Sequence, residues 1–143
     1  MTPRETHFDG IHCKLAILHY SSGVVIIRIS GTDIGEFGDV PMRALSERLQ
    51  DLDAIDLFID AQEVRGASIE VSADWASWLN ANRAKLRGVF MLTGSRFIEV
   101  TADFVRRFAA LQGVMKIYTR PAAFDAALAA ALERNNHAKE ARG

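Results

Sequence analysis

The chain has a single cysteine, Cys13, among its 143 residues. One thiol cannot form an intramolecular disulfide or a cysteine-based metal cluster, so we expect a protein of the reducing cytoplasm. Long apolar runs are also missing, since none approaches the roughly 20 residues that a membrane-spanning helix needs. We therefore expect no membrane span.

The sequence also lacks an excess of charge of either sign. It contains 17 Lys and Arg residues against 18 Asp and Glu residues, its formal net charge is -1, and it has no run of five or more basic residues. Proteins recognise nucleic acids through concentrated positive charge. Nucleic acid is therefore not an expected partner.

Motifs for cofactors and metals are absent as well. Gly31, Gly35 and Gly38 have neither the dinucleotide-binding spacing nor the phosphate-loop spacing, and we interpret them as a flexible turn. His12 and His19 are an odd number of positions apart, which places them on opposite faces of a strand. The sequence predicts no cofactor and no metal site.

The chain does contain a regular alternation of strand-like and helix-like segments. Residues 14–20 and 24–30 are rich in aliphatic residues, and the Ser-Ser-Gly between them predicts a hairpin. Three later apolar runs predict strands, and four amphipathic runs predict helices. These strands are residues 55–61, 89–92 and 114–118, and the helices begin near Asp39, Ser72, Thr101 and Pro121.

Strands that are separated by helices have to run parallel, because the helix returns the chain to the starting edge. We therefore predict one α/β domain over residues 1–143, with a core over about 14–134 and a polar tail over 135–143. Its sheet is expected to be mostly parallel and five-stranded, with an antiparallel N-terminal strand and about four helices.

Local patterns predict where two of the helices begin. Asp39 precedes Pro41, a favoured residue in a first helical turn, and is expected to cap the first helix. Thr101 is expected to cap the third helix, where Val100 and Val105 are spaced as a hydrophobic staple.

Other patterns predict which aromatic side chains are buried. Phe104 and Phe108 are expected to face the core from the third helix. Trp75 and Trp78 share an apolar stripe of the second helix, and we interpret them as core packing.

The junction at residues 57–75 is the most informative segment, because a buried strand runs there into acidic residues, a glycine turn and a helix start. In parallel sheets, this carboxyl edge is where binding sites are built. The candidate partner-binding or ligand-binding residues at this edge are Asp60, Arg65, Ser68, Glu70, Thr93, Ser95 and Arg96. No pair among them has the spacing of acid–base or nucleophilic catalysis, so we predict no enzyme and no catalytic residue.

A basic run lies elsewhere in the chain, at Arg83, Lys85 and Arg87. We interpret it first as a solvated helix end. Together with Arg65 and Arg96 it is also a candidate patch for an anionic ligand.

Several segments resemble STAS domains, the family of SpoIIAA-like anti-anti-sigma factors. The stretch VVIIRISGTDIGEFGDVPMRALSERL is similar to the opening of such domains, LFIDAQEVRG to their third strand and VFMLTGS to their fourth. MKIYTRPAAFDAAL is similar to their final strand and helix, so the resemblance covers residues 14–134. It implies a regulatory, protein-interaction module whose partner is an anti-sigma-like regulator.

The phosphorylation switch of that family departs from its pattern in this chain. The family carries the phosphoacceptor in an Asp-Ser-Ser/Thr-Gly turn, whereas residues 65–71 read RGASIEV. Ile69 or Glu70 stands at the acceptor position, and Ser68 is the remaining candidate phosphosite. We interpret the switch as lost; the alternative is that Glu70 imitates the phosphorylated state permanently.

Two other interpretations stay open. Eight Phe and two Trp residues are enough to line a cleft, which favours a domain that binds a small anionic or apolar ligand or a lipid. A response-regulator receiver domain is the second interpretation, because typical positions of that domain are occupied here by Asp60, Thr93 and Arg120. The acidic pair that would hold Mg²⁺ is missing, so this receiver would be degenerate. A homodimer is compatible with any of these.

Overall fold

The computed structural model describes residues 2–142, and the side chains of Phe97, Phe108 and residues 135–142 lie outside that description. The strands are β1 (Arg4–Asp9), β2 (Cys13–His19), β3 (Val24–Asp33), β4 (Ile55–Ala67), β5 (Leu86–Thr93) and β6 (Met115–Tyr118). The helices are α1 (Val40–Leu49), α2 (Ile69–Ala81), the 3-10 turn η1 (Arg83–Lys85), α3 (Arg96–Phe108) and α4 (Pro121–Arg142). The backbone of the expected polar tail is thus helical as far as Arg142.

The strands form one six-stranded sheet whose spatial order is the order of the sequence, β1-β2-β3-β4-β5-β6. The first two pairings are antiparallel and the remaining three are parallel. This confirms the predicted α/β sheet and its hairpin, and corrects the number of strands from five to six. The sequence pattern missed β1 because Phe8 is its only large apolar residue.

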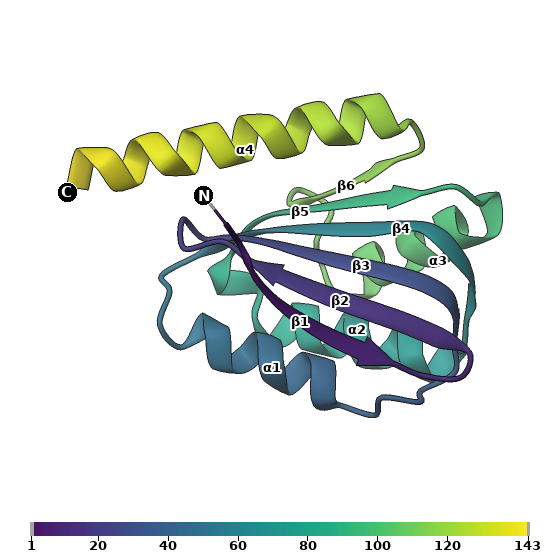
Figure 1. Ribbon diagram of the computed structural model, residues 1–143. Helices are drawn as coiled ribbons and strands as arrows, with labels where there is room; N and C mark the ends of the chain where they lie inside the picture. Colours follow the sequence, from purple (N-terminus) through teal and green to yellow (C-terminus); the bar gives the residue numbers. More distant parts are fainter. Residues whose placement is uncertain (1, 143) are drawn as a thin grey trace.

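Helices α1, α2 and α3 cover one face of the sheet, and α4 lies alone on the other (Figure 1). Each crossover after β3 moves one strand further in the same direction, and crossovers of one hand then place their helices on one side. A receiver domain has a sheet order that reverses, 2-1-3-4-5. The observed order excludes the receiver interpretation.

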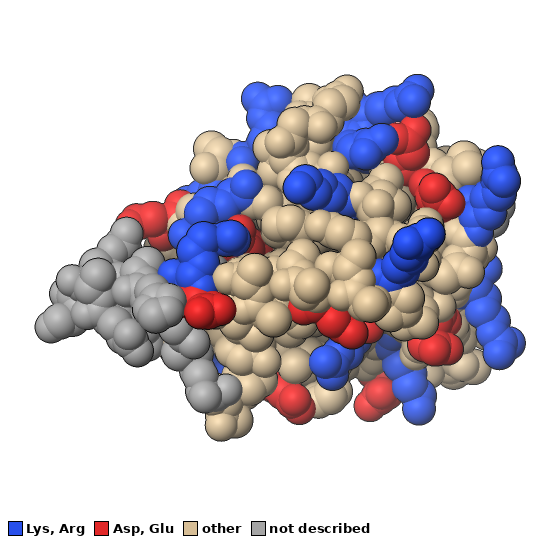
Figure 2. All heavy atoms as spheres, turned by 90° about the horizontal axis from the view of Figure 1, so that it is seen from above, with Lys and Arg blue, Asp and Glu red and all other residues tan. Residues whose placement is uncertain are grey.

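The face that α4 covers has a small aromatic core. Phe58 stacks on Phe90 with ring centroids 4.4 Å apart, and the edge of Phe124 from α4 meets Phe58 at 5.7 Å. Figure 2 looks down on this side of the molecule: uncharged residues fill its middle, and charged side chains of both signs lie around them.

A buried carboxylate adds a polar connection to the same layer. The side chain of Asp56 is 3% exposed, and its Oδ2 lies 3.6 Å from the Arg87 guanidinium and 3.7 Å from that of Arg134. Arg134 belongs to α4 and Asp56 to β4. The ion pairs therefore connect the helix to the sheet at a place where a lone buried charge would be costly.

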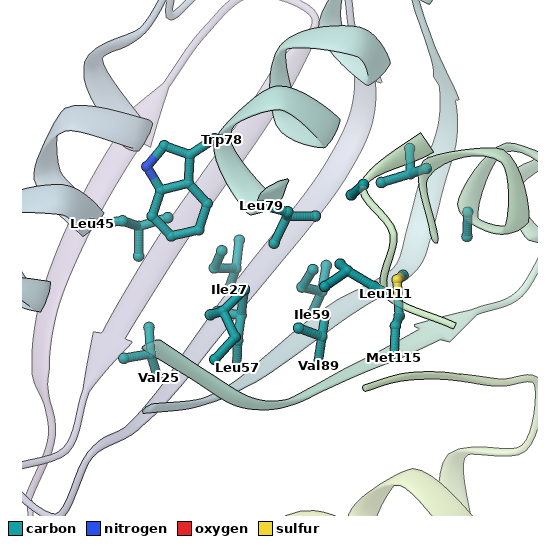
Figure 3. Close-up of a cluster of buried hydrophobic side chains, with 14 of the residues drawn as sticks. Val25, Ile27, Leu45, Leu57, Ile59, Trp78, Leu79, Val89, Leu111 and Met115 are labelled. Carbon is teal, nitrogen blue, oxygen red and sulfur yellow. The ribbon is translucent and has the colours of Figure 1, made fainter. Parts of the chain in front are cut away.

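The larger core fills the space between the sheet and helices α1, α2 and α3 (Figure 3). Trp78 and Leu79 of α2 pack there over Ile27 and Leu57 of the sheet, and the Trp78 indole N–H donates a 2.9 Å hydrogen bond to Ser46 Oγ of α1. Trp78 is buried as predicted. Trp75 is half-buried and meets Trp78 edge-on at 6.2 Å.

The start of α3 differs from its prediction. The helix begins at Arg96, with Ser95 at the N-cap position, so Thr101 lies in the second turn and caps nothing. Val100 is 65% exposed and Phe104 51% exposed, so the predicted staple and the inward orientation of Phe104 are both wrong. The prediction for the Phe108 side chain falls outside the described residues.

The other helix starts are nearer to expectation. Asp39 does occupy the N-cap position of α1, but its side chain makes no capping bond and instead pairs with Arg43 at 3.2 Å. Helix α2 begins at Ile69, three residues before the predicted start, because strand β4 runs on to Ala67 and leaves no loop.

Gly31 allows the β1–β2 turn to pack against strand β3. Its φ is 87°, and a Cβ built on it would lie 2.2 Å from the carbonyl oxygen of His12. The neighbouring Thr32 amide donates to that same oxygen at 2.8 Å. A side chain at position 31 would therefore separate the turn from the strand.

We expect Gly31→Ala to lower the free energy of unfolding by ~2 kcal/mol or more, since left-handed strain adds to a steric clash. Urea denaturation followed by circular dichroism measures this change. Gly113→Ala is the matched control, because no atom lies within 4 Å of its built Cβ and its φ is not in the left-handed region. Equal midpoints for the two variants would contradict the expectation.

Candidate functional site

Three loops meet at the edge of the sheet where β1, β3 and β4 end, on the right of Figure 1. They are the β1–β2 turn, the loop from β3 to α1, and the junction from β4 to α2. Backbone hydrogen bonds join them: the Ser68 amide donates to the Asp33 carbonyl at 2.9 Å, and Thr32 binds His12 as described above. The three loops therefore form one continuous edge.

Glu36 strengthens this connection. Its carboxylate accepts hydrogen bonds from the amides of Ile11, at 2.8 Å, and His12, at 2.7 Å. Desolvation alone would raise the pKa of Glu36, but the amide donors of His12 and Ile11 outweigh it, and the pKa lies below its ordinary value. The ionised form thus holds the β1–β2 turn against the loop before α1.

Each of the three loops exposes one isoleucine. Ile11 is 90% exposed, Ile34 55% and Ile69 85%. Ile34 and Ile69 directly follow Asp33 and Ser68, the two residues that the backbone bond joins. We call this surface, made of Ile11, Ile34 and Ile69, the isoleucine edge.

A groove of about 200 Å³ runs beside the isoleucine edge, between the β3–α1 loop and the first turns of α2. Ile34 and Phe37 line one side, and Glu70 and Asp74 of α2 line the other. Its lining also includes Asp33 but no lysine or arginine. The groove therefore combines apolar surface with negative charge.

Ser68, the candidate phosphosite, is the N-cap of α2. Its Oγ accepts a hydrogen bond from the Val71 amide at 3.1 Å, and its carbonyl oxygen accepts from the Ser72 amide at 3.0 Å. These bonds satisfy helix-start groups that would otherwise lack partners. The geometry assigns Ser68 a structural role, and its phosphorylation stays a prediction.

Two of the predicted residues lie beside Ser68. Glu70 is exposed in the first turn of α2, where its negative charge is favourable near the positive end of the helix dipole. Arg65 is exposed near the end of β4, at an irregularity in the pairing with β3.

Asp60 belongs to a different surface. It pairs in register with Arg28 and Leu92, so its side chain is on the α4 face of the sheet, and its Oδ1 accepts from the Gln62 amide at 3.1 Å. There it lines a shallow pocket with Lys14, Arg28 and Glu63. The structure therefore separates Asp60 from Ser68 and Glu70.

Thr93, Ser95 and Arg96 form the turn into α3. Thr93 is buried. Its Oγ1 donates a hydrogen bond to the Ser95 carbonyl at 3.0 Å and accepts one from the Ser95 amide at 3.2 Å. Its hydroxyl thus shapes the turn and is not presented to a ligand. Arg96 is exposed and lines a pocket on the outer side of α3 with Glu99 and Asp103.

The proposed anion patch is wrong, because Arg83, Lys85 and Arg87 precede or begin β5 and so lie at the opposite edge from Arg65 and Arg96. Lys85 Nζ donates to the Leu49 carbonyl at the end of α1, at 2.7 Å. Arg87 pairs with the buried Asp56. These cations connect elements of the fold.

The sequence did not identify the isoleucine edge. The available signal was a lone isoleucine among glycine and polar residues, as in Asp33-Ile34-Gly35 and Ser68-Ile69-Glu70. Nothing in such a pattern says that loops far apart in the sequence meet at one edge.

The described residues offer little reactive chemistry. Among the side chains that the structure describes, no group of three or more His, Cys, Asp or Glu residues could hold a metal ion. Burial, together with the charges of Asp33 and Glu36, raises the pKa of the Cys13 thiol to about 11. At neutral pH this thiol is protonated and inaccessible.

Comparison with known proteins supplies the fold family. No family model matches the chain, and no curated protein matches it. In shape it is similar to an uncharacterised DUF3478-family protein with a SpoIIAA-like fold from Shewanella loihica PV-4, with a TM-score of 0.59 and 15% identity over 81% of this chain and 94% of that one. An anti-sigma factor antagonist from Mycobacterium paratuberculosis matches with a TM-score of 0.47 and 18% identity, covering 90% of this chain and 94% of that one.

The protein therefore has a SpoIIAA-like fold, as its resemblance to STAS domains predicted. At 15% identity the likeness establishes the fold and leaves function to the residues themselves. In the part of the chain that the structure describes, no helix has the length and apolar character to cross a membrane.

We expect Ser68→Ala to lower the free energy of unfolding by about 1 kcal/mol, since the Val71 amide loses its capping partner. Ser77→Ala, at an exposed position in the middle of the same helix, is the control and should leave stability nearly unchanged. Denaturant midpoints for both variants measure the difference. A larger loss for Ser77→Ala than for Ser68→Ala would refute the capping role.

We also expect Cys13 to resist thiol reagents in the folded protein. A pKa near 11 in place of 9.0 lowers the thiolate fraction at neutral pH roughly 100-fold, and burial blocks access. Labelling with Ellman's reagent at pH 8 should be slow in buffer and fast in 8 M urea, which serves as the control. Labelling at the same rate in both conditions would contradict this assignment.

Proposed function

We propose that this chain is a non-enzymatic regulatory module that binds a protein partner through the isoleucine edge and the acidic groove beside it. The candidate partner is an anti-sigma-like regulator of the cytoplasm. The observation that carries the proposal is the exposure of Ile11, Ile34 and Ile69 in three separate loops that hydrogen bonds join into one surface.

Single exposed apolar residues are ordinary on protein surfaces, but apolar residues that gather on one surface mark interaction sites. A partner would remove these side chains from water, which is the main favourable term in protein association.

The groove indicates the chemistry of the partner. Asp33, Glu70 and Asp74 line it without a compensating cation in the lining, so it complements a surface that carries lysine or arginine beside aliphatic residues. Such charge complementarity acts mainly on the rate and specificity of association.

We further propose that binding does not depend on phosphorylation. The Ser68 oxygen already accepts the capping hydrogen bond of α2, and the serine doublet and glycine of the family turn are absent. The module would then bind constitutively, with its regulation arising from the partner or from a ligand.

The test compares Ile69→Ser with Val100→Ser, an exposed apolar residue on α3 that is outside the isoleucine edge. Wild-type chain immobilised in native lysate should capture a partner, and the purified partner should bind Ile69→Ser at least ten times more weakly, in line with loss of an interface anchor. Val100→Ser should bind as the wild type does.

Glu70→Lys provides an independent check, since reversing a groove charge should slow association and alter its salt dependence. Equal affinities of Ile69→Ser and wild type for every captured protein would refute the proposed surface. Sedimentation of the chain alone distinguishes a second copy of itself from a different partner.

A further inference from the structure

The interior of the protein contains a cavity that the proposed partner surface does not use. It has a volume of about 100 Å³ and lies between β3, β4 and β5 on one side and α2 and α3 on the other. A cavity needs only ~10–15 Å³ to hold one water molecule, and protein interiors contain few larger voids. This space therefore has room for a ligand larger than one water molecule.

Small side chains and an irregular strand create the cavity. Ala61 of β4 and Ala102 of α3 both line it, and both are buried. The pairing of β3 with β4 is irregular after Asp60, so both Ala61 and Val64 turn toward the helices. Larger residues at these positions would have filled the space.

The lining is almost entirely hydrocarbon. The oxygen atoms come from Asp33, Ser72 and Thr101, and two of these side chains already bond within their own turns: Asp33 Oδ1 accepts from the Gly35 amide at 3.1 Å, and Ser72 Oγ donates to the Ser68 carbonyl at 3.1 Å. Water finds few hydrogen-bond partners in such a space, so its lining suits an apolar occupant.

Three residues in the lining favour an aromatic occupant. Met91 and Met115 bring flexible thioethers, which make favourable contacts with aromatic rings, and Trp75 supplies an aromatic wall. The Asp33 carboxyl at one end disfavours an anion such as a fatty-acid head group. The chemistry therefore selects an uncharged ring.

The cavity is accessible from one side. Met91 is only half-buried, although its strand has neighbours on both sides and its side chain faces the helices. Asp33, Val71 and Trp75 line both this cavity and the acidic groove, so these three residues lie between the two. A movement of the Trp75 side chain would open a path between them.

We propose that this cavity is a binding site for a small uncharged aromatic molecule of about the size of benzene or toluene. The inference stands without the proposed protein partner, because it rests on the volume and lining of the interior.

The experiment uses the intact chain with benzene and toluene as probes and methyl-¹³C methionine as the NMR label. We expect concentration-dependent shifts of the Met91 and Met115 methyl signals, whereas Met42, which lines the acidic groove instead, should not shift. The melting temperature should rise by roughly 3–6 °C at a free probe concentration of about ten times Kd.

Filling the cavity should abolish these effects. Ala102→Leu is expected to bind benzene at least tenfold more weakly, and Ala61→Val provides a smaller change if the leucine variant does not fold. Unchanged Met91 and Met115 signals in the wild type at saturating benzene would overturn the proposal. Shifts confined to Met42 would overturn it as well, because they would place the probe in the groove.

Discussion

The constraint on which the rest of the structure depends is the direction of the three crossovers after β3. Each steps to the next strand on the same side, so the sheet order never reverses and α1, α2 and α3 all cover one face. A reversal is what opens a ligand crevice in doubly wound sheets, and this fold lacks it. The partner surface and the ligand cavity that we propose are accordingly built from loops along the edge and from space within the three-helix layer.

The same constraint leaves the opposite face to α4. One helix cannot cover six strands, so α4 packs over the aromatic residues of the central strands, where Asp56 and Arg134 add an ion pair. Beyond its reach the sheet surface carries Lys14, Arg28 and Asp60 in solvent. This explains why Asp60, at the end of a buried strand, is part of a polar sheet face and is separated from the α2 junction by the sheet itself.

Much of the architecture was predictable because hydrophobic periodicity and helix signals are local. Short patterns were enough to predict the hairpin at Ser21-Ser22-Gly23, the strand at 55–61 and the burial of Trp78. The wrong predictions concern segments in which tertiary contacts outweighed these local sequence signals. Strand β1 is held by backbone pairing with almost no apolar pattern, and Val100 and Phe104 are exposed because α3 begins five residues before the expected cap.

The sequence by itself determined the class of fold and the departure from the family's phosphorylation motif, because both depend on residue types and spacing along the chain. Only the tertiary structure decided which residues meet. It placed Ser68 at a helix start, gathered Ile11, Ile34 and Ile69 on one edge, and brought Ala61 and Ala102 into the lining of one cavity. The isoleucines and the alanines belong to segments 23 to 58 residues apart, and sheet register and helix packing, which no local pattern encodes, bring them together.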